Sequence, residues 1–362
     1  MRGYDRPQST MLTLVNPEQR VPANHPIRLI KELAEVALQE LSPLFAQMYS
    51  EVGRPSIPPE RLLKASLLMA LYTVRSERMF CEQLDYNLLF RWFLDLNWDE
   101  PGFDHSSFSR NRARLLAHDV AGEFFRTVVA EARELKLTSH EHFTVDGTLI
   151  EAWASLKSFR PKGEEPSAHT PDDPGNPSVN FHGERRQNAT HQSTTDPEAR
   201  LAKKGAGKEA RLCYTQSVLM ENRNGIMLDL RVGQASGRAE CEQGLAMLEA
   251  VHGAHRITVA GDKGYDPAAF VASCRALNVT PHVAQNERRA GGSALDPRTT
   301  IWPGYAVSQR VRKRVEEIFG WIKTVGNFRR TRYRGVERTS FAAYLVGAAY
   351  NLLRIAKLCP SG

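Results

Sequence analysis

In a short segment near the C-terminus, Gln309–Lys323, one acid and two bases are spaced so that they would share one face of a helix. At about 100° per residue, Arg312, Glu316 and Lys323 fall within about 40° of one another on a helix. An apolar stripe lies about 120° away on the same helix and comprises Val311, Val315, Ile318, Ile322 and Val325. The pattern predicts a helix with one buried face and a second face on which a carboxylate lies between two cations. An ordinary amphipathic helix with an Arg–Glu pair has the same pattern, so its meaning depends on the other acids of the chain.

Two further carboxylates lie in runs with the alternating pattern of strands. Asp146 lies within His142–Leu149, and Asp262 ends the run Arg256–Asp262. An unpaired charge inside a buried strand is costly, although an aspartate that begins a turn with the following glycine is common. Functional sites of open α/β sheets form at strand ends. We therefore consider Asp146, Asp262 and Glu316 together as a candidate site.

Three converging carboxylates need a cationic partner, because like charges repel and each must lose water. A divalent metal ion meets this need, since Mg²⁺ prefers oxygen ligands and keeps several of its waters. Two such ions can stabilise both the attacking and the leaving oxygen of an in-line phosphoryl transfer. Basic side chains on the same helix face would then hold the phosphates. The three acids thus predict metal-dependent phosphoryl transfer.

Positive charge is concentrated close to Glu316. The chain has a net charge of +7 and a pI near 9.2. Residues 310–338 contain ten Lys or Arg and three Glu, so this segment alone carries +7 (10 − 3). Its arginines are interleaved with Phe328 and Tyr333, a pattern typical of proteins that bind polyphosphates. A solvated basic face is the alternative interpretation.

The periodicity of apolar residues divides the chain at about residue 138. Residues 1–138 are predicted to be helical, over Pro26–Leu41, the run that Pro59 opens, Glu77–Leu96, Ser107–Leu116 and Val120–Leu135. Residues 139–362 alternate strands and helices, with a hairpin at Asn224-Gly225. Their order predicts a mixed α/β sheet with helices on its faces. Residues 157–208 are rich in proline and polar residues and are predicted to be a disordered insertion.

Length and composition set further limits. A chain of 362 residues, 41% apolar and 25% charged, is typical of a globular protein of two or three domains. It has no apolar run of 18 residues and no secretory signal at its N-terminus, so we expect no membrane contact and a cytoplasmic location. Its five cysteines lack the spacing of a zinc site or of a disulfide framework.

Several motifs together resemble one family. VDGT, GDKGYD and RVRKRVEEIFGWIK resemble the three catalytic blocks of DDE-class bacterial insertion-sequence transposases, whose core is RNase H-like. The run that begins GRPSIPPERLLKAS, together with FDHSSFSRNR, resembles their N-terminal helical domain, and ENRNGIMLDLRVGQASGRAE and AAYNLLRIAKL resemble further blocks. The resemblance covers nearly the whole chain except the polar insertion. It implies an RNase H-like catalytic domain over residues 139–362, preceded by an all-α domain (1–138) for DNA binding or dimerisation.

The resemblance also assigns roles to individual residues. It implies that Asp146, Asp262 and Glu316 are catalytic and ligate Mg²⁺, with Mn²⁺ as a substitute and two ions as the expected number. Arg312, Glu316 and Lys323 match the family's Y-R-E-K signature, and Gln309 stands where the tyrosine often lies. Arg312 and Lys323 are expected to contact phosphates at the transposon end. The basic cluster adds further predicted DNA contacts: Arg310, Arg314, Arg329, Arg330, Arg332 and Arg334.

The implied activity is DNA transposition. Such a protein binds the terminal inverted repeats of its insertion sequence, hydrolyses the phosphodiester at each end, and joins the freed 3′-OH to target DNA. The expected partners are double-stranded DNA and a second copy of the chain in a synaptic complex, at the nucleoid of a bacterium; no membrane and no small-molecule substrate are expected. A metal-dependent nuclease of the same fold would share the three acids but lack strand transfer. A non-catalytic DNA-binding relic is disfavoured because all three acids are present.

Overall fold

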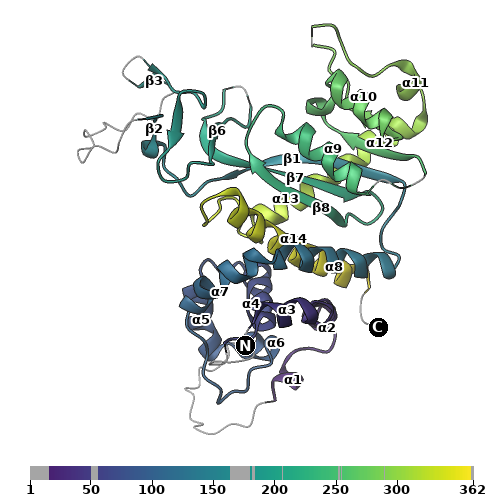
Figure 1. Ribbon diagram of the computed structural model, residues 1–362. Coiled ribbons are helices and arrows are strands. Elements are labelled where there is room, and N and C mark those ends of the chain that lie inside the picture. The colour runs from purple at the N-terminus through teal and green to yellow at the C-terminus, as the bar shows by residue number, and fades with distance from the viewer. Residues whose placement is uncertain are drawn as a thin grey trace, which may run out of the picture.

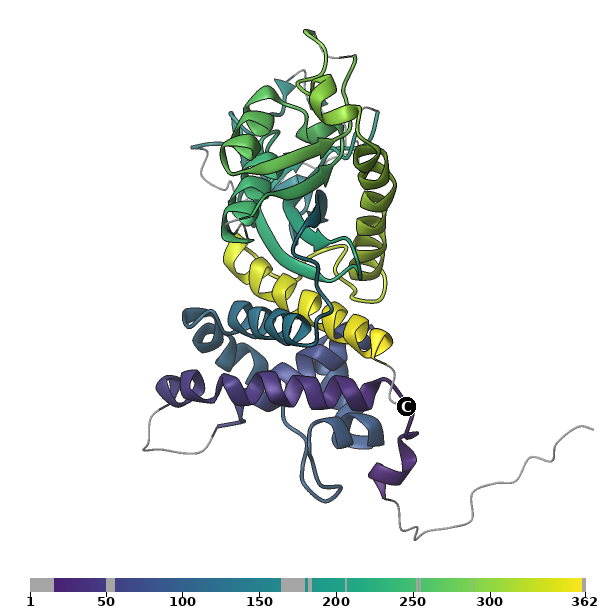
Figure 2. The same ribbon diagram turned by 90° about the vertical axis from the view of Figure 1, so that its right-hand side faces the viewer.

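The computed structural model describes residues 16–49, 56–163, 180–181, 184–205, 207–251, 253, 255–288 and 290–359. A helical part and an α/β part lie one above the other, and two long helices, α8 and α14, run between them (Figures 1 and 2). Among the described helices, none is both long and apolar enough to cross a membrane.

The helical part follows the predicted periodicity, with two helices divided where the sequence carries a breaker or a cap. Its helices are α1 (Pro17–Arg20), α2 (Ile27–Glu40), α3 (Ser42–Met48), α4 (Pro59–Leu71), α5 (Glu77–Tyr86), α6 (Leu88–Phe93), α7 (Ser106–Ala117) and α8 (Val120–Glu134). Pro43 restarts the chain as α3, because proline suits the first turn of a helix. The single helix predicted over Glu77–Leu96 is wrong: Asn87 ends α5, and its side chain accepts a hydrogen bond of 3.2 Å from the Phe90 amide to cap α6.

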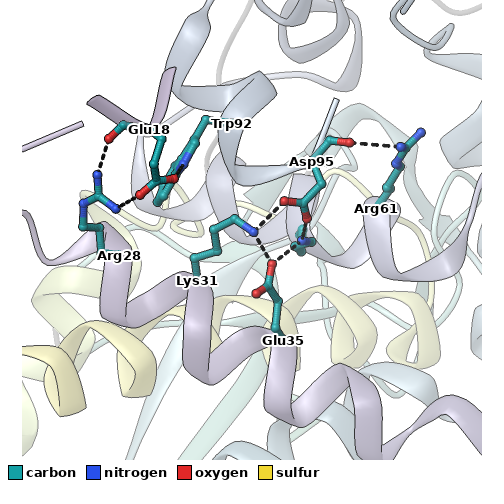
Figure 3. A network of polar contacts seen from close by, with 8 residues as sticks. Glu18, Arg28, Lys31, Glu35, Arg61, Trp92 and Asp95 are labelled. Carbon is teal, nitrogen blue, oxygen red and sulfur yellow. Dashed lines mark hydrogen bonds and ion pairs between the residues drawn. The ribbon is translucent and has the colours of Figure 1, made fainter. Parts of the chain in front are cut away.

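A polar network ties α2 and α4 to the turn after α6 (Figure 3). Lys31 and Lys64 each bind both Glu35 and Asp95. The side chain of Lys64 is only 5% exposed, so its ammonium group depends on these two carboxylates for compensation of its charge. Burial opposes ionisation of Asp95, but the bonds from Lys31 and Lys64 outweigh it, so the pKa of Asp95 is lowered. The network therefore holds the first helices of the chain in one arrangement.

The α/β part is built on one mixed sheet. Its principal strands are β1 (His142–Glu151), β7 (Arg211–Glu221), β8 (Met227–Gln234), β9 (Ile257–Gly261) and β10 (Val279–Val283). β1, β7 and β8 form an antiparallel meander, whereas β9 pairs in parallel with β1, and β10 in parallel with β9. The order β10-β9-β1-β7-β8, with helix α9 (Ala239–Val251) between β8 and β9, is that of an RNase H-like fold. The predicted fold class is confirmed.

Helices complete the α/β part. α10 (Ala268–Ala276) connects β9 to β10, and α11 (Pro297–Thr300) and α12 (Pro303–Val311) follow. The continuous helix predicted over Gln309–Lys323 is wrong in detail, because a 3₁₀ turn at Arg312–Arg314 separates α12 from α13 (Val315–Lys323). The apolar stripe is largely confirmed, since Val315, Ile318 and Ile322 are buried.

The polar insertion is not structureless in its described part. β2 (Phe159–Pro161) pairs with β5 (His191–Ser193), β3 (Asn180–Phe181) pairs with β4 (Glu184–Arg185), and β6 (Arg200–Ala202) extends the main sheet beside β7. A small apolar cluster of Ala152, Phe159, Ala199, Leu212 and Tyr214 stabilises it. The Tyr214 hydroxyl donates a hydrogen bond of 2.6 Å to buried Asp196. Three of these residues, Ala152, Leu212 and Tyr214, lie outside the insertion, so its own polar composition does not show the apolar surface on which its described part packs. Residues 164–179, 182–183 and 206 of the insertion lie outside the described residues.

The closing helix joins the two parts into one core. α14 (Val336–Leu358) packs on β8 and α13 of the α/β part and on α2, α4 and α8 of the helical part. One continuous cluster of buried residues therefore extends from Val21 to Ala356. A cavity of about 90 Å³ remains where the two parts meet, lined by Glu77, Arg112 and Tyr333 among others. It lies away from the three predicted acids, none of which lines it.

Candidate active site

Asp146 and Asp262 occupy equivalent positions on neighbouring parallel strands. The last registered pair of β1 and β9 is Thr144 with Ala260, and each aspartate lies two residues further along its chain. Since alternate residues of a strand face the same side, the two carboxylates lie near each other at the carboxyl end of β9. The sequence predicted Asp146 within one strand and Asp262 at the end of another, and the register explains why the two lie near each other.

The Asp146 carboxylate is held in a partly buried, negatively charged environment. Its pKa is raised to about 7, and burial is the largest cause. The Gly147 amide that donates to it lowers the pKa, Asp262 and Glu240 raise it, and the charge of Arg312 lowers it. The Gly147 bond is 2.8 Å long and reaches Oδ1, and Asp262 Oδ1 likewise accepts a bond of 2.7 Å from the Gly264 amide. The second oxygen of each carboxylate receives no hydrogen bond from the described residues.

Glu240 is an acid of this site that sequence reasoning missed. It is the second residue of α9, and its carboxylate lies against Gly147: a Cβ atom at Gly147 would be 2.6 Å from Glu240 Cδ and Oε1. Burial raises the pKa of Glu240, and Asp262 raises it further. The only signal in the sequence was that the family-like block ENRNGIMLDLRVGQASGRAE ends at this residue.

Glu316 lies on the first turn of α13, where its side chain is exposed. α13 packs against β1, and at its C-terminal end Lys323 donates a hydrogen bond to Thr148 Oγ1. Thr148 and Asp146 are two residues apart on β1 and face the same side of the sheet. The structure thus brings Asp146 and Asp262 together, joins Lys323 to Thr148 of the same strand as Asp146, and leaves Glu316 on the exposed surface of the adjoining helix.

Gln309, which stands where the signature Y-R-E-K has its tyrosine, joins β10 to Arg312. Its side-chain amide donates to the His282 carbonyl on β10 and accepts a bond of 3.0 Å from Arg312 Nε. Arg312 is a cation whose charge favours ionised Asp146. Gln309 therefore orients Arg312 relative to the sheet, which no pattern in the sequence indicated.

The other cations predicted to bind DNA fall into two groups. Arg314 donates to the carbonyls of Asn222 and Arg223, Arg330 donates to Ala152 O and lies 4.7 Å from the Trp153 ring, and Arg332 donates to Val74 O. These three have structural partners within the protein. By contrast, the guanidinium groups of Arg310, Arg329 and Arg334 form no hydrogen bond or ion pair with other described residues, and these three side chains are exposed, as are Arg330 and Arg332.

The acids of the site fit a divalent cation by their charge and donor type. Asp146, Asp262, Glu240 and Glu316 form no ion pair with any described Lys, Arg or His, since the ion pairs involve other acids. Uncompensated carboxylates with free oxygens are the ligands that Mg²⁺ prefers. In the described conformation, no three His, Cys, Asp or Glu residues are grouped closely enough to hold an ion. The two aspartates lie near each other, but no third described acid completes a ligand set with them in this conformation.

Two known protein families match most of this chain. Residues 139–352 match the family described as "Transposase DDE domain", and residues 15–114 match the one described as "Transposase domain (DUF772)". The first match spans more than half of the chain, which therefore belongs to the transposase DDE domain family. The protein is a DNA transposase, an enzyme of the metal-dependent polynucleotidyl transferase and endonuclease class. No curated protein matches the chain significantly.

Solved structures resemble this one only distantly. A piggyBac transposase synaptic complex with hairpin DNA is 11% identical, with a TM-score of 0.41, and the match covers 92% of this chain and 75% of that one. A pre-cleavage Mos1 transpososome is 12% identical, with a TM-score of 0.20 and coverage of 85% and 82%. A Mos1 paired-end complex with Mn is 12% identical, with a TM-score of 0.21 and coverage of 83% and 80%. These scores are too low to support an argument about this chain.

Proposed function

We propose that this transposase binds the terminal inverted repeats of its insertion sequence, cleaves the 3′ ends of the element and joins them to target DNA. The observation that carries the proposal is the equivalent placement of Asp146 and Asp262 on β1 and β9, where neither aspartate forms an ion pair with a described cation. An acidic pair beside a basic helix suits the transfer of phosphodiester bonds, because acids hold metal ions while bases hold phosphates.

In this proposal Asp146, Asp262 and Glu316 hold two Mg²⁺ ions, for which Mn²⁺ substitutes. When bound, such ions act as Lewis acids and lower the pKa of bound water. The residues of the chain orient the DNA and neutralise the charge of its phosphates. Lys323 and Arg312 hold phosphates at the transposon end, and Glu316 approaches the aspartates from α13 when DNA is bound. Two copies of the chain hold the two ends of the element.

The remaining cations contribute unequally to DNA binding. The exposed, unpaired side chains of Arg310, Arg329 and Arg334 are free to contact phosphates and to release counterions. Arg314, Arg330 and Arg332 already bind carbonyl groups of the protein, so they position the surface on which DNA lies. This division separates direct phosphate contacts from structural cations within the basic segment.

The decisive experiment measures Mg²⁺- or Mn²⁺-dependent cleavage and joining of DNA that carries the gene's flanking ends. Glu316→Gln is compared with wild type and with Glu317→Gln, a matched change at the neighbouring exposed position. We expect Glu316→Gln to lower both reactions by at least about 10²–10³-fold and to leave DNA binding intact, whereas Glu317→Gln retains activity. Full activity of Glu316→Gln would contradict the assignment of the site.

The same assay separates the alternatives. Cleavage without joining would identify a nuclease of the same fold. Binding of the ends without either reaction, under conditions in which the ends are intact and metal is present, would identify a DNA-binding protein that has lost catalysis.

A further inference from the structure

Glu240 approaches the site through a gap that only glycine leaves open. Its carboxylate occupies the position of a Cβ atom at Gly147, with Oε1, Cγ and Cδ each 2.6 Å from that position. Gly147 directly follows Asp146 on β1, and its amide donates to the Asp146 carboxylate. A side chain at residue 147 would therefore displace the Glu240 carboxylate. No role for Glu240 follows from the three predicted acids.

Buried hydroxyl groups without partners surround the same place. The Tyr265 hydroxyl is fully buried and has no hydrogen-bond partner in the described structure. Burial raises the pKa of Tyr265 well above its usual value, and Glu240, Asp146 and Asp262 are the next largest influences on it. Ser217, which is registered opposite Gly147 and so faces the same side of the sheet, is also fully buried, and its hydroxyl is unpartnered. Unsatisfied buried polar groups are uncommon and indicate a missing ligand or water.

The charge around Glu240 is uncompensated as well. Burial and then Asp262 raise the pKa of Glu240, and besides burial Asp262 and Glu240 raise the pKa of Asp146. None of the three forms an ion pair with a described cation, although the charge of Arg312 acts on Asp146. Three mutually repelling carboxylates beside orphaned hydroxyl groups are costly to assemble unless a cation joins them. The arrangement therefore points to an ion rather than to a structural acid.

We propose that Glu240 is a fourth carboxylate of the metal site, which holds a divalent cation together with Asp146 and Asp262 in the absence of DNA and without Glu316. The inference rests on the proposed function, because it assumes that the two aspartates ligate metal. It adds that the resting enzyme already carries one ion, held from α9 on the side of Gly147. Closing this ligand set requires rotation of the side chains, since no three acids are within ligand distance in the described conformation.

The test is binding of Mn²⁺ to the full chain without DNA, measured by isothermal titration calorimetry and by loss of the free Mn²⁺ signal in electron paramagnetic resonance. Glu240→Gln keeps the size of the side chain and removes its charge. We expect it to raise the Kd for Mn²⁺ by about 10–100-fold. Glu242→Gln, an exposed position in the same helical turn, and Glu316→Gln should bind within about twofold of wild type.

Thermal unfolding separates metal binding by Glu240 from a purely structural role of this residue. The thermal unfolding temperature in EDTA should be equal or higher for Glu240→Gln than for wild type, because one repelling charge is gone. Addition of Mn²⁺ should then stabilise wild type and fail to stabilise the variant. A Glu240→Gln protein that is stabilised by Mn²⁺ as wild type is would overturn the proposal.

Gly147→Ala provides a second, independent variant. The backbone of Gly147 lies in a regular strand without a positive φ, so alanine is tolerated there, but its Cβ would push Glu240 aside. All carboxylates remain, yet we expect the same loss of Mn²⁺ affinity. Wild-type affinity in this variant, no Mn²⁺ binding by the wild-type protein without DNA, or its loss in Glu316→Gln would each overturn the inference. None of these results would affect cleavage and joining as the test of the proposed function.

Discussion

The ammonium group of Lys323 donates a hydrogen bond to the hydroxyl of Thr148, and so joins α13 to the strand that carries Asp146. Burial lowers the pKa of Lys323, and the nearby cations Lys204 and Arg329 lower it further. A cation kept in a positively charged environment gains most from an anionic ligand. The bond thus fixes Lys323 on the strand that carries Asp146, and in the proposed function this ammonium group binds a phosphate of the transposon end.

Lys323→Met is expected to weaken binding of DNA ends of any sequence and to reduce the slope of log K against log salt concentration by about 1. Thr148→Val keeps the ammonium group and serves as the control, with an unchanged slope. Binding titrations over a range of salt concentrations measure both variants. Identical slopes for Lys323→Met and wild type would remove Lys323 from the phosphate contacts.

Gln309→Ala should release Arg312, because Gln309 is the residue that connects the guanidinium group to the β10 carbonyl of His282. We expect the cleavage rate to fall by about 10²-fold, as misplacement of a positioned group does, with little loss of DNA affinity. Val307→Ala, an exposed change on the same helix, is the control. Single-turnover cleavage and binding are measured side by side, and an unchanged rate would show that Arg312 needs no such orientation.

Asp146→Asn should stabilise the protein in EDTA at alkaline pH. The folded-state pKa of Asp146 is raised to about 7 from 3.8, its value in the unfolded chain. At pH values below 3.8, protonated Asp146 therefore makes its full contribution to the stability of the folded protein. That contribution is lost as pH rises from about 4 to about 7. The variant lacks this loss, so its unfolding temperature should exceed that of wild type at pH 8 and match it near pH 4. Thermal unfolding at the two pH values provides the measurement. An equal difference in unfolding temperature between variant and wild type at both pH values would show that the raised pKa of Asp146 is not the cause.

Asp95→Asn should remove part of the acid sensitivity of the helical part. The folded-state pKa of Asp95 is lowered because its bonds to Lys31 and Lys64 outweigh burial, so its contribution to stability is present above the unfolded value of 3.8 and is lost as pH falls below it. The side chain is 58% exposed, and screening limits the effect to about 1 kcal/mol or less. In urea unfolding, the wild type should be more stable than the variant at pH 7 but not at pH 3.

Local sequence signals predicted the elements well and their long-range contacts poorly. The hairpin at Asn224-Gly225 was predicted because glycine permits the positive φ of 75° that this turn requires. The division of α5 from α6 at Asn87 was missed, since the apolar periodicity continues across the cap. The short strands of the insertion were missed because they depend on pairing with one another and with β7.

The candidate site shows the same difference between local sequence signals and long-range contacts. Asp146, Asp262 and Glu316 lie in motifs that a family resemblance identifies, and two of them lie in strand-like runs. Glu240 lies against the backbone of residue 147 only because Gly147, 93 positions earlier in the chain (240 − 147), has no side chain. No periodicity or spacing reports such a contact, which exists only after β1 and α9 have packed.

The shared packing of α14 has a consequence for synthesis of the protein. α2, α4 and α8 are made early, but part of their apolar surface is covered by a helix that begins only at Val336. At about 5–20 residues per second, the roughly 200 residues between α8 and α14 take about 10–40 s to be translated. During that time the nascent helical part has an incomplete core. The enzyme therefore becomes fully folded only when the last helix has left the ribosome, and exposure to chaperones or proteases in that interval affects how much of it accumulates.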